Sequence, residues 1–282
     1  MTEPRRHRPG PLAFVLLAIL AFLFILVPFL FWRQTWFGRP LTDPELTRYL
    51  EAPGLDRRTQ HALVQLSERM VSRDASVRQW YPGLIRAAGS PDPAIRNLAA
   101  WTMGQDPYSS VLHEALRSLL NDPDLQVRRN AALSLVRFGD AAGHAELVAV
   151  LRPVEIRAAK GGILRLLVRP GQAVGAGTRV VTIKENGGRE QHQTAPLHAK
   201  VAAVHVQDGV RLQPGDRLIT LAPQEEDVWE ALRALYFVGN ADDIEDIEHY
   251  SHGVSDMPER IARQARLTTA AIRNRPVPSS SR

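Results

Sequence analysis

The stretch DPDLQVRRNAALSLVRFGD, residues 122–140, decides the fold of the largest part of this chain of 282 residues. Its first two residues, Asp122 and Pro123, are typical of a helix start, because an acid caps the first turn and proline already has a helical φ. Four apolar residues then follow at spacings of 4, 4 and 3, which places them on one face of a helix. They are Val127, Ala131, Leu135 and Phe138. The stretch therefore predicts a short amphipathic helix that ends near Gly139.

The same pattern occurs earlier in the chain, as DPAIRNLAAWTMGQD at residues 92–106. The arginines Arg96 and Arg128 are 32 residues apart, and the glycines Gly104 and Gly139 are 35 residues apart. A period of this length is typical of a solenoid built from helix–turn–helix units. Each unit of a solenoid buries its apolar face against its neighbours, so the pattern predicts a stack of helix pairs.

The repeated order of acid, proline, aliphatic residue with arginine, small residues and glycine resembles bacterial HEAT-like repeats of the phycobilisome-lyase type. The resemblance covers residues 90–151 well and residues 57–88 loosely. It implies a right-handed stack of antiparallel helix pairs. It also implies that Arg96 and Arg128 bond acids or carbonyls of neighbouring repeats.

The helical pattern returns near the C-terminus. At an offset of 100 residues, Gly239 corresponds to Gly139 and the surrounding small and apolar residues agree. We therefore expect HEAT-like helices over residues 41–152 and again over residues 224–275. The last residues, 276–282, are expected to be a disordered tail.

Residues 153–223, between the two helical segments, consist of β-branched runs separated by Gly and Pro turns, which predicts strands. The segment is an internal duplication, because nine pairs of residues correspond at an offset of 38. The pairs are Ala158/Pro196, Ile163/Val201, Leu166/Val204, Val168/Val206, Gly171/Gly209, Val174/Leu212, Gly177/Gly215, Val180/Leu218 and Thr182/Thr220. A β module inserted into the helical stack is therefore expected.

Each half of this module has two turn glycines, because a positive φ is accessible chiefly to glycine. They are Gly171 and Gly177 in the first half and Gly209 and Gly215 in the second. Their spacing, with the aliphatic residues between them, resembles the biotinyl/lipoyl-like domain in the version found in secretion and efflux adaptor proteins. The resemblance implies an all-β, flattened barrel of two interlocked four-stranded halves.

The biotinyl/lipoyl-like family includes carriers, which hold biotin or lipoate on a lysine at the hairpin joining the halves, and adaptors. The joining segment here is residues 184–193, and its tip, Asn186-Gly187-Gly188, has no lysine. Lys184 lies one strand end away and is a weak carrier candidate. We therefore expect no bound cofactor. The ten-residue segment also replaces the long helical hairpin that export adaptors insert here.

The N-terminal part contains the uncharged, apolar stretch PLAFVLLAILAFLFILVPFLFW at residues 11–32. A helix of this length is about 33 Å long, enough for a bilayer core of about 30 Å. We expect a transmembrane helix over residues 11–33, rather than a cleaved signal peptide, after a tail of residues 1–10. Arginines in that tail favour a cytoplasmic N-terminus. The expected localisation is a single-pass protein of a bacterial inner membrane, in contact with lipid through residues 11–33 and mostly periplasmic.

The composition excludes several kinds of chemistry. The chain has no cysteine, which excludes disulfides, thiolate catalysis and cysteine zinc sites. Only Lys160, Lys184 and Lys200 are lysines and no basic block is interleaved with aromatics, so the net charge of +5 does not predict nucleic-acid binding. Phosphate-binding and nucleophile motifs are also missing from the sequence. We expect no catalytic residues and no metal site.

Two short motifs remain as candidate sites. His249 and His252 have a spacing unlike that of a metal-binding helix and are interpreted as exposed residues at a helix end. Trp80 and Tyr81 are the candidate exposed aromatic patch for a partner protein.

Together these features predict a multidomain α and β protein with one transmembrane helix, a HEAT-like α-solenoid and an inserted biotinyl/lipoyl-like barrel. The expected function is that of a non-enzymatic scaffold or assembly subunit that binds other membrane or periplasmic proteins. The alternatives are a periplasmic adaptor of an export or efflux system and a biotin or lipoate carrier.

Overall fold

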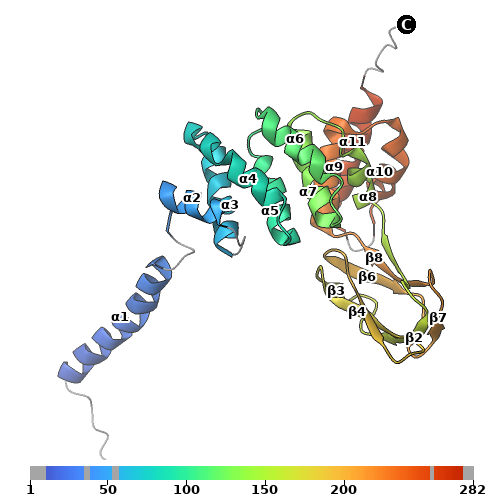
Figure 1. Ribbon diagram of the computed structural model, residues 1–282, viewed down its shortest axis with the longest axis horizontal. Coiled ribbons are helices and arrows are strands. Elements are labelled where there is room, and N and C mark those ends of the chain that lie inside the picture. Colours follow the sequence, from blue (N-terminus) through green and yellow to red (C-terminus); the bar gives the residue numbers. More distant parts are fainter. Residues whose placement is uncertain (1–10, 35–38, 53–56, 255–256, 276–282) are drawn as a thin grey trace, which may run out of the picture.

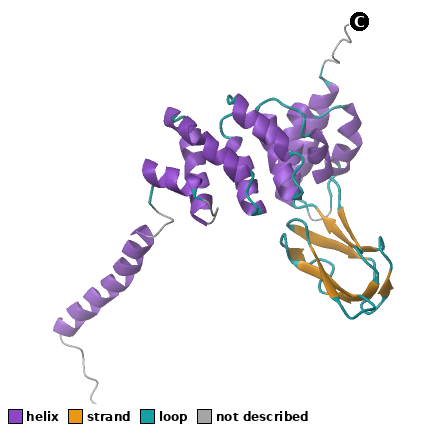
Figure 2. Ribbon diagram, in the orientation of Figure 1, coloured by secondary structure: helices purple, strands orange, loops and turns teal. Residues whose placement is uncertain are grey.

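The computed structural model describes residues 11–34, 39–52, 57–254 and 257–275. Helices make up one part of the described chain, and two antiparallel β-sheets make up the other (Figure 2). The chain is therefore a mixed α and β protein. The tails predicted at residues 1–10 and 276–282 lie outside the described residues.

The first helix, α1 (Pro11–Gln34), lies apart from the other helices (Figure 1). Its described side chains are those of residues 15–17 and 19–30. Crossing a bilayer core takes about 20 consecutive apolar residues in one helix. None of the helices in the described residues has the length and apolar character needed to span a membrane. This finding contradicts the predicted transmembrane helix over residues 11–33, and with it the single-pass inner-membrane localisation. The lipid contact expected for the same residues stays a prediction.

The helices that follow α1 form a row of pairs (Figure 1). The second helix of each pair packs on the second helix of the next pair, so α3, α5, α7, α9 and α11 make one continuous layer. The helices are α2 (Asp43–Glu51), α3 (Arg57–Val71), α4 (Tyr81–Ala88), α5 (Pro93–Met103), α6 (Ser110–Leu119), α7 (Leu125–Arg137), α8 (His144–Val150), α9 (Glu225–Val238), α10 (Ile244–Ser251) and α11 (Glu259–Arg273), with the 3₁₀ turns η1 (Ala75–Trp80) and η2 (Ala241–Asp243).

The two stretches that begin with Asp-Pro start their helices differently. Asp92 caps α5, because its Oδ1 accepts a hydrogen bond of 2.9 Å from the backbone N–H of Ala94. In the second copy the cap is Asp124, whose Oδ1 accepts from the N–H of Gln126 at 2.9 Å. The helix start predicted at Asp122 is therefore two residues early. Asp122 instead accepts from the N–H of Asp124 at 2.8 Å, which leaves its carboxylate free for another repeat.

Hydroxyl groups join neighbouring helices of the continuous layer. The Oγ1 of Thr102 in α5 donates to the carbonyl of Leu63 in α3 at 3.4 Å. The Oγ of Ser134 in α7 donates to Ala100 in α5 at 3.0 Å. In the described residues no such bond joins α7 to α9. In this described part of the chain, the junction between α7 and α9 therefore lacks the hydroxyl bonds that join the preceding helices of the layer.

The β part consists of two four-stranded antiparallel sheets, in the orders β1-β8-β6-β3 and β5-β4-β2-β7. Adding 38 to the bounds of β4 gives those of β8, and the same offset turns β3 into β7. The strand order of one sheet therefore maps onto that of the other, as the duplication predicts. The strands are β1 (Val154–Arg157), β2 (Gly162–Leu166), β3 (Ala173–Val174), β4 (Arg179–Lys184), β5 (Glu190–Thr194), β6 (Ala199–Val204), β7 (Arg211–Leu212) and β8 (Arg217–Ala222).

The sheets enter and leave the helical row at one place. The chain passes from α8 into β1 and returns from β8 into α9, and Val154 lies opposite Leu221 in the β1–β8 pair. The two helices that flank the insertion pack on each other in one apolar cluster, which includes Leu151 and Val228. Leu125, at the start of α7, packs against the apolar core of the sheets. The β part therefore occupies the connection within one helix pair.

Candidate functional site

The aromatic residues predicted to bind a partner are buried. Trp80 is 3% exposed and Tyr81 is 8% exposed. The Nε1–H of Trp80 donates to Oγ1 of Thr47 at 2.9 Å, and the phenol of Tyr81 donates to the carboxylate of Asp106. Both rings belong to the core of the helical row, so the exposed patch expected at these positions is not there.

The repeat arginines lie between helix pairs. Arg96 donates from Nε and Nη2 to the two carboxylate oxygens of Asp122, at 2.7 and 2.8 Å, and from Nη1 to the carbonyl of Ser90 at 2.8 Å. Arg128 donates from Nε to Oε1 of Glu146 at 2.8 Å and from Nη1 to the carbonyl of Asp122 at 2.9 Å. Each arginine therefore connects its own repeat to the next.

The remaining sequence-predicted residues lie at turns and strand ends. The four turn glycines of the β part all have left-handed φ values, +82° at Gly171, +77° at Gly177, +80° at Gly209 and +92° at Gly215. Lys184 is the last residue of β4 and lies opposite Ile163 of β2 and Glu190 of β5. Residues 185–189 close the joining hairpin through a hydrogen bond of 2.9 Å from the N–H of Glu185 to the carbonyl of Arg189.

The histidine pair lies at the end of α10. The ring of His249 packs edge-on against Tyr250, and Nδ1 of His252 lies 3.2 Å from the carbonyl of Glu248. Both histidines are exposed. Nowhere in residues 11–34, 39–52, 57–254 and 257–275 do three or more metal-ligating side chains gather as a metal ion requires.

A cleft opens at the junction between α7 and α9. A cavity of ≈ 250 Å³ lies between α5, α7 and α9, and an adjoining cavity of ≈ 60 Å³ continues it toward the start of α9. We call the two together the α7–α9 cleft. Trp101 of α5 and Phe237 of α9 line it and are 42% and 67% exposed. The other lining residues are Gln126, Arg129, Asn130, Leu133, Ser134, Val136, Arg137, Val150, Asp227, Glu230, Ala231, Arg233 and Ala234.

The smaller cavity of this cleft contains a buried arginine, Arg129, that forms one long ion pair but lacks hydrogen bonds at Nε and Nη1. The side chain of Arg129 is 7% exposed, and its Nε and Nη1 have no hydrogen-bond partner. Oδ2 of Asp227 lies 4.0 Å from Nη1, too far for a hydrogen bond, and is itself buried without a hydrogen bond. Burial lowers the pKa of Arg129 and raises that of Asp227. Such groups are costly unless something else satisfies them.

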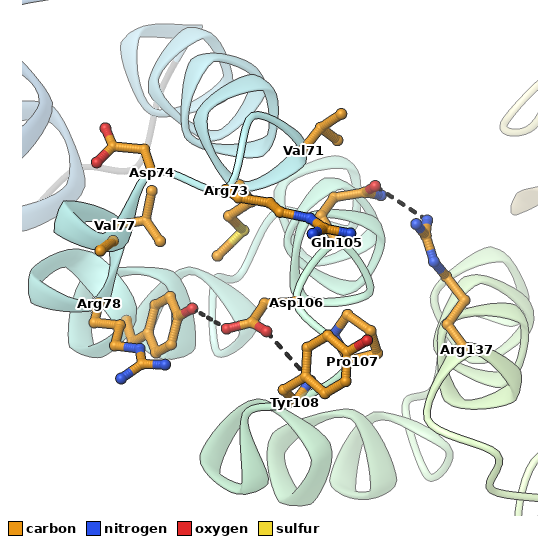
Figure 3. A pocket seen from close by; sticks show the side chains of 13 residues that line it. Val71, Arg73, Asp74, Val77, Arg78, Gln105, Asp106, Pro107, Tyr108 and Arg137 are labelled. Atoms are coloured by element: carbon orange, nitrogen blue, oxygen red, sulfur yellow. Dashed lines mark hydrogen bonds between the residues drawn. The ribbon is translucent and has the colours of Figure 1, made fainter.

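A second concave site lies beside this cleft, toward the N-terminal helices of the row. It has a volume of ≈ 630 Å³ and is formed by the end of α3, η1, the start of α4, the α5–α6 loop and the last residue of α7 (Figure 3). We call it the arginine pocket because Arg73, Arg78 and Arg137 line it. Arg137 also lines the α7–α9 cleft, so the two sites adjoin.

The sequence contains a signal for the two cleft aromatics, Trp101 and Phe237, which lie outside the pattern of buried residues in their helices. In α5 the buried residues include Ile95, Ala99 and Met103, at a spacing of four. Trp101 lies two positions after Ala99 and two before Met103, which is about 200° around the helix. Its side chain therefore lies off the buried face. In α9 Phe237 lies two positions after the buried Leu235. A large aromatic residue off the apolar face of a repeat helix is the signal.

Comparison with known proteins gives one family relationship. No curated protein sequence matches the chain. A solved structure described as "Structure and function of a single-chain, multi-domain long-chain acyl-coa carboxylase" is 17% identical, with a TM-score of 0.24. The similarity covers 45% of this chain and 15% of the carboxylase chain, and it carries no argument about fold or function. Residues 81–159 match the family of HEAT repeats, which confirms HEAT-like repeats in this part of the chain.

Proposed function

We propose that the protein is a non-enzymatic scaffold that binds a partner protein through the α7–α9 cleft. The observation that carries the proposal is that one cleft combines exposed Trp101 and Phe237 with the buried Arg129, whose Nε and Nη1 lack hydrogen bonds. Aromatic residues and arginine supply a large share of the binding energy at protein interfaces, chiefly in desolvated pockets. A partner side chain or carbonyl that reaches Arg129 forms a hydrogen bond that the free protein lacks.

The family relationship supports the same site. HEAT repeats generally mediate protein–protein interactions, and stacked repeats present extended surfaces for them. Trp101, Leu133 and Arg137 lie within the matched residues 81–159. The partner therefore contacts the helical layer itself.

We also propose that residues 153–223 are a biotinyl/lipoyl-like module inserted within a helix pair and acting as a rigid second arm of the scaffold. The two four-stranded sheets and their common offset of 38 residues support this assignment. The contact between Leu125 and the barrel core supports a fixed orientation. Because the hairpin tip at residues 185–189 has no lysine, the module serves binding rather than covalent cofactor transfer.

The test compares two double variants in the native host. Trp101→Ser/Phe237→Ser removes the cleft aromatics, and Val111→Ser/Leu267→Ser removes two exposed apolar residues of α6 and α11 that do not line the cleft. Partners are crosslinked in the cell, purified with the tagged full chain and quantified by mass spectrometry. Melting temperatures of both variants check that the fold is retained.

For at least one partner, the proposal expects the recovered amount to fall about tenfold or more in the cleft variant and to match that of the unsubstituted protein in the control. The reason is that hot-spot residues contribute about 2 kcal/mol or more each to binding. A partner set that is the same for both variants contradicts it.

A further inference from the structure

The arginine pocket is a separate binding site, and its side chains define what it binds. We propose that it holds an acidic segment of a partner polypeptide, with carboxylates paired to Arg73 and Arg78. The proposal goes beyond the scaffold function because the chemistry differs from that of the α7–α9 cleft. Its volume of ≈ 630 Å³ lies within the range of about 300–1,000 Å³ that is typical of ligand pockets.

The first argument is the backbone of Arg73. Among the residues that the structure describes, it is the one non-glycine residue in the left-handed region, with φ +57°. It lies two residues after the end of α3, where its N–H donates to the carbonyl of Met70 at 2.9 Å and the N–H of Asp74 donates to that of Arg69 at 3.0 Å. Glycine is the residue that this helix-end geometry favours, because any Cβ is crowded there. An arginine held in an unfavourable backbone conformation points to a use for its side chain.

The second argument is the distribution of charge. Arg73 and Arg78 are exposed, and neither guanidinium forms a hydrogen bond or ion pair within the described part of the chain. The two acids of the pocket, by contrast, are used by the fold. Asp106 accepts the phenol proton of Tyr81 and the N–H of Tyr108, and Asp74 accepts the N–H of Ser76 at 2.9 Å. The pocket therefore has two guanidinium groups without hydrogen-bond partners in the described residues, whereas its two carboxylates already accept hydrogen bonds from neutral donors.

The direction of the side chains agrees with this division. Arg73 reaches across the pocket toward Gln105, which accepts a hydrogen bond of 3.0 Å from Arg137, whereas the carboxylate of Asp74 points away (Figure 3). Planar guanidinium groups bind carboxylates through two parallel N–H donors.

The apolar lining favours a polypeptide over a polyphosphate. Met70, Val71 and Val77 line the pocket, and the ring of Tyr108 is 91% exposed beside it. A peptide places an aliphatic side chain on this surface while its acids reach the arginines. The sugar-phosphate backbone of a nucleic acid has no such apolar group.

The test begins with selection from a display library of random octapeptides against the full chain. The best selected peptide is then labelled with fluorescein, and its affinity is measured by anisotropy for the full chain and three variants. Arg73→Gly and Arg78→Gln remove pocket charges. Arg165→Gln removes an exposed arginine of β2 and is the matched control.

The proposal expects selected peptides enriched in Asp and Glu, affinity that falls as salt is raised, and about tenfold weaker binding to Arg73→Gly and to Arg78→Gln than to Arg165→Gln. Arg73→Gly is expected to melt no lower than the unsubstituted chain, because glycine suits its φ. Trp101→Ser/Phe237→Ser, which tests the other site, is expected to leave peptide affinity unchanged.

Three outcomes of the selection and affinity measurements overturn the proposal. They are a failure to select any peptide, selected peptides without acidic enrichment, and equal affinity for the pocket variants and Arg165→Gln. Displacement of the peptide by a single-stranded oligonucleotide at equal concentration also overturns it, in favour of a nucleic-acid site.

Discussion

Arg96 and Asp122 face each other across the junction between two helix pairs and form two parallel hydrogen bonds, of 2.7 and 2.8 Å. Both side chains are largely buried. Arg128 occupies the equivalent position 32 residues later, but its bond to Glu146 is single and more exposed. The same sequence signal therefore gives two contacts of different strength.

Arg96→Ala is expected to lower the free energy of unfolding by about 3–5 kcal/mol, because it leaves the carboxylate of Asp122 buried without its partner. Arg128→Ala is expected to cost less, about 1–2 kcal/mol, because Glu146 can turn toward water. Urea unfolding followed by circular dichroism measures both. Equal losses of unfolding free energy in the two variants would show that the two parallel hydrogen bonds of Arg96 add nothing to stability.

Gly139 and Gly239 correspond in the sequence but are required for different reasons. Gly139 has φ +71° and open space around it, whereas a Cβ on Gly239 would lie 2.5 Å from the carbonyl oxygen of Leu235 and 2.8 Å from Cδ1 of Ile272. Both alanine variants are expected to lose about 1–3 kcal/mol of stability. Asparagine distinguishes them, because it tolerates left-handed φ but is larger.

Gly139→Asn is therefore expected to melt higher than Gly139→Ala, and Gly239→Asn lower than Gly239→Ala. Thermal denaturation of the four variants is the measurement. A higher melting temperature for the asparagine variant than for the alanine variant at both positions would contradict the steric explanation for Gly239.

Much of the fold follows from local signals in the sequence. Asp92 caps the expected helix, and the duplicated glycines such as Gly171 and Gly209 take the expected left-handed φ, because caps and turns depend on a few adjacent residues. The site does not follow in this way. Trp80 is buried because α2 supplies Thr47 to its indole, a contact between residues 33 apart that no local pattern contains. The surroundings of Arg129 likewise depend on α9, because its ion-pair partner Asp227 lies almost 100 residues later.

Asp140 links the stability of the helical row to acid pH. It accepts hydrogen bonds from Nε of Arg117 at 2.6 Å and from His113 at 2.7 Å, and the Arg117 guanidinium is the main cause that lowers its pKa to about 2. A carboxyl group with a lowered folded pKa stabilises the protein fully above its unfolded pKa of about 3.9, and this contribution is lost as the pH falls toward about 2.

Asp140→Asn is expected to lower stability by about 1–2 kcal/mol at pH 7 and to leave stability less dependent on pH between about 4 and 2. Glu114→Gln, at an exposed position of α6, is the control. Urea midpoints measured from pH 7 to pH 2 give the comparison. A variant whose pH dependence matches that of the control would remove Asp140 from this role.

The β part is expected to be removable. Val154 and Leu221 are neighbours across β1 and β8, and the flanking helices α8 and α9 share an apolar cluster that includes Leu151 and Val228. The end of α8 is also joined to α10 by a hydrogen bond of 2.6 Å from Tyr250 to the carbonyl of Leu151. Replacement of residues 154–222 by a short Gly/Ser linker is expected to leave a helical remainder that melts cooperatively, as seen by circular dichroism. An aggregated or unfolded product would show that the barrel belongs to the core of the helical row.

The central claim is that a partner protein occupies the α7–α9 cleft, and a position-specific photo-crosslink tests it most directly. A benzophenone amino acid is placed at Phe237 in the cleft or at Leu267 on α11, two exposed apolar positions, in the full chain expressed in its native host. Irradiated products are separated and identified by mass spectrometry. The account predicts one discrete crosslinked partner from position 237, lost when Trp101→Ser is added, and no product of that mass from position 267. No crosslink from position 237, or the same products from both positions, would contradict it.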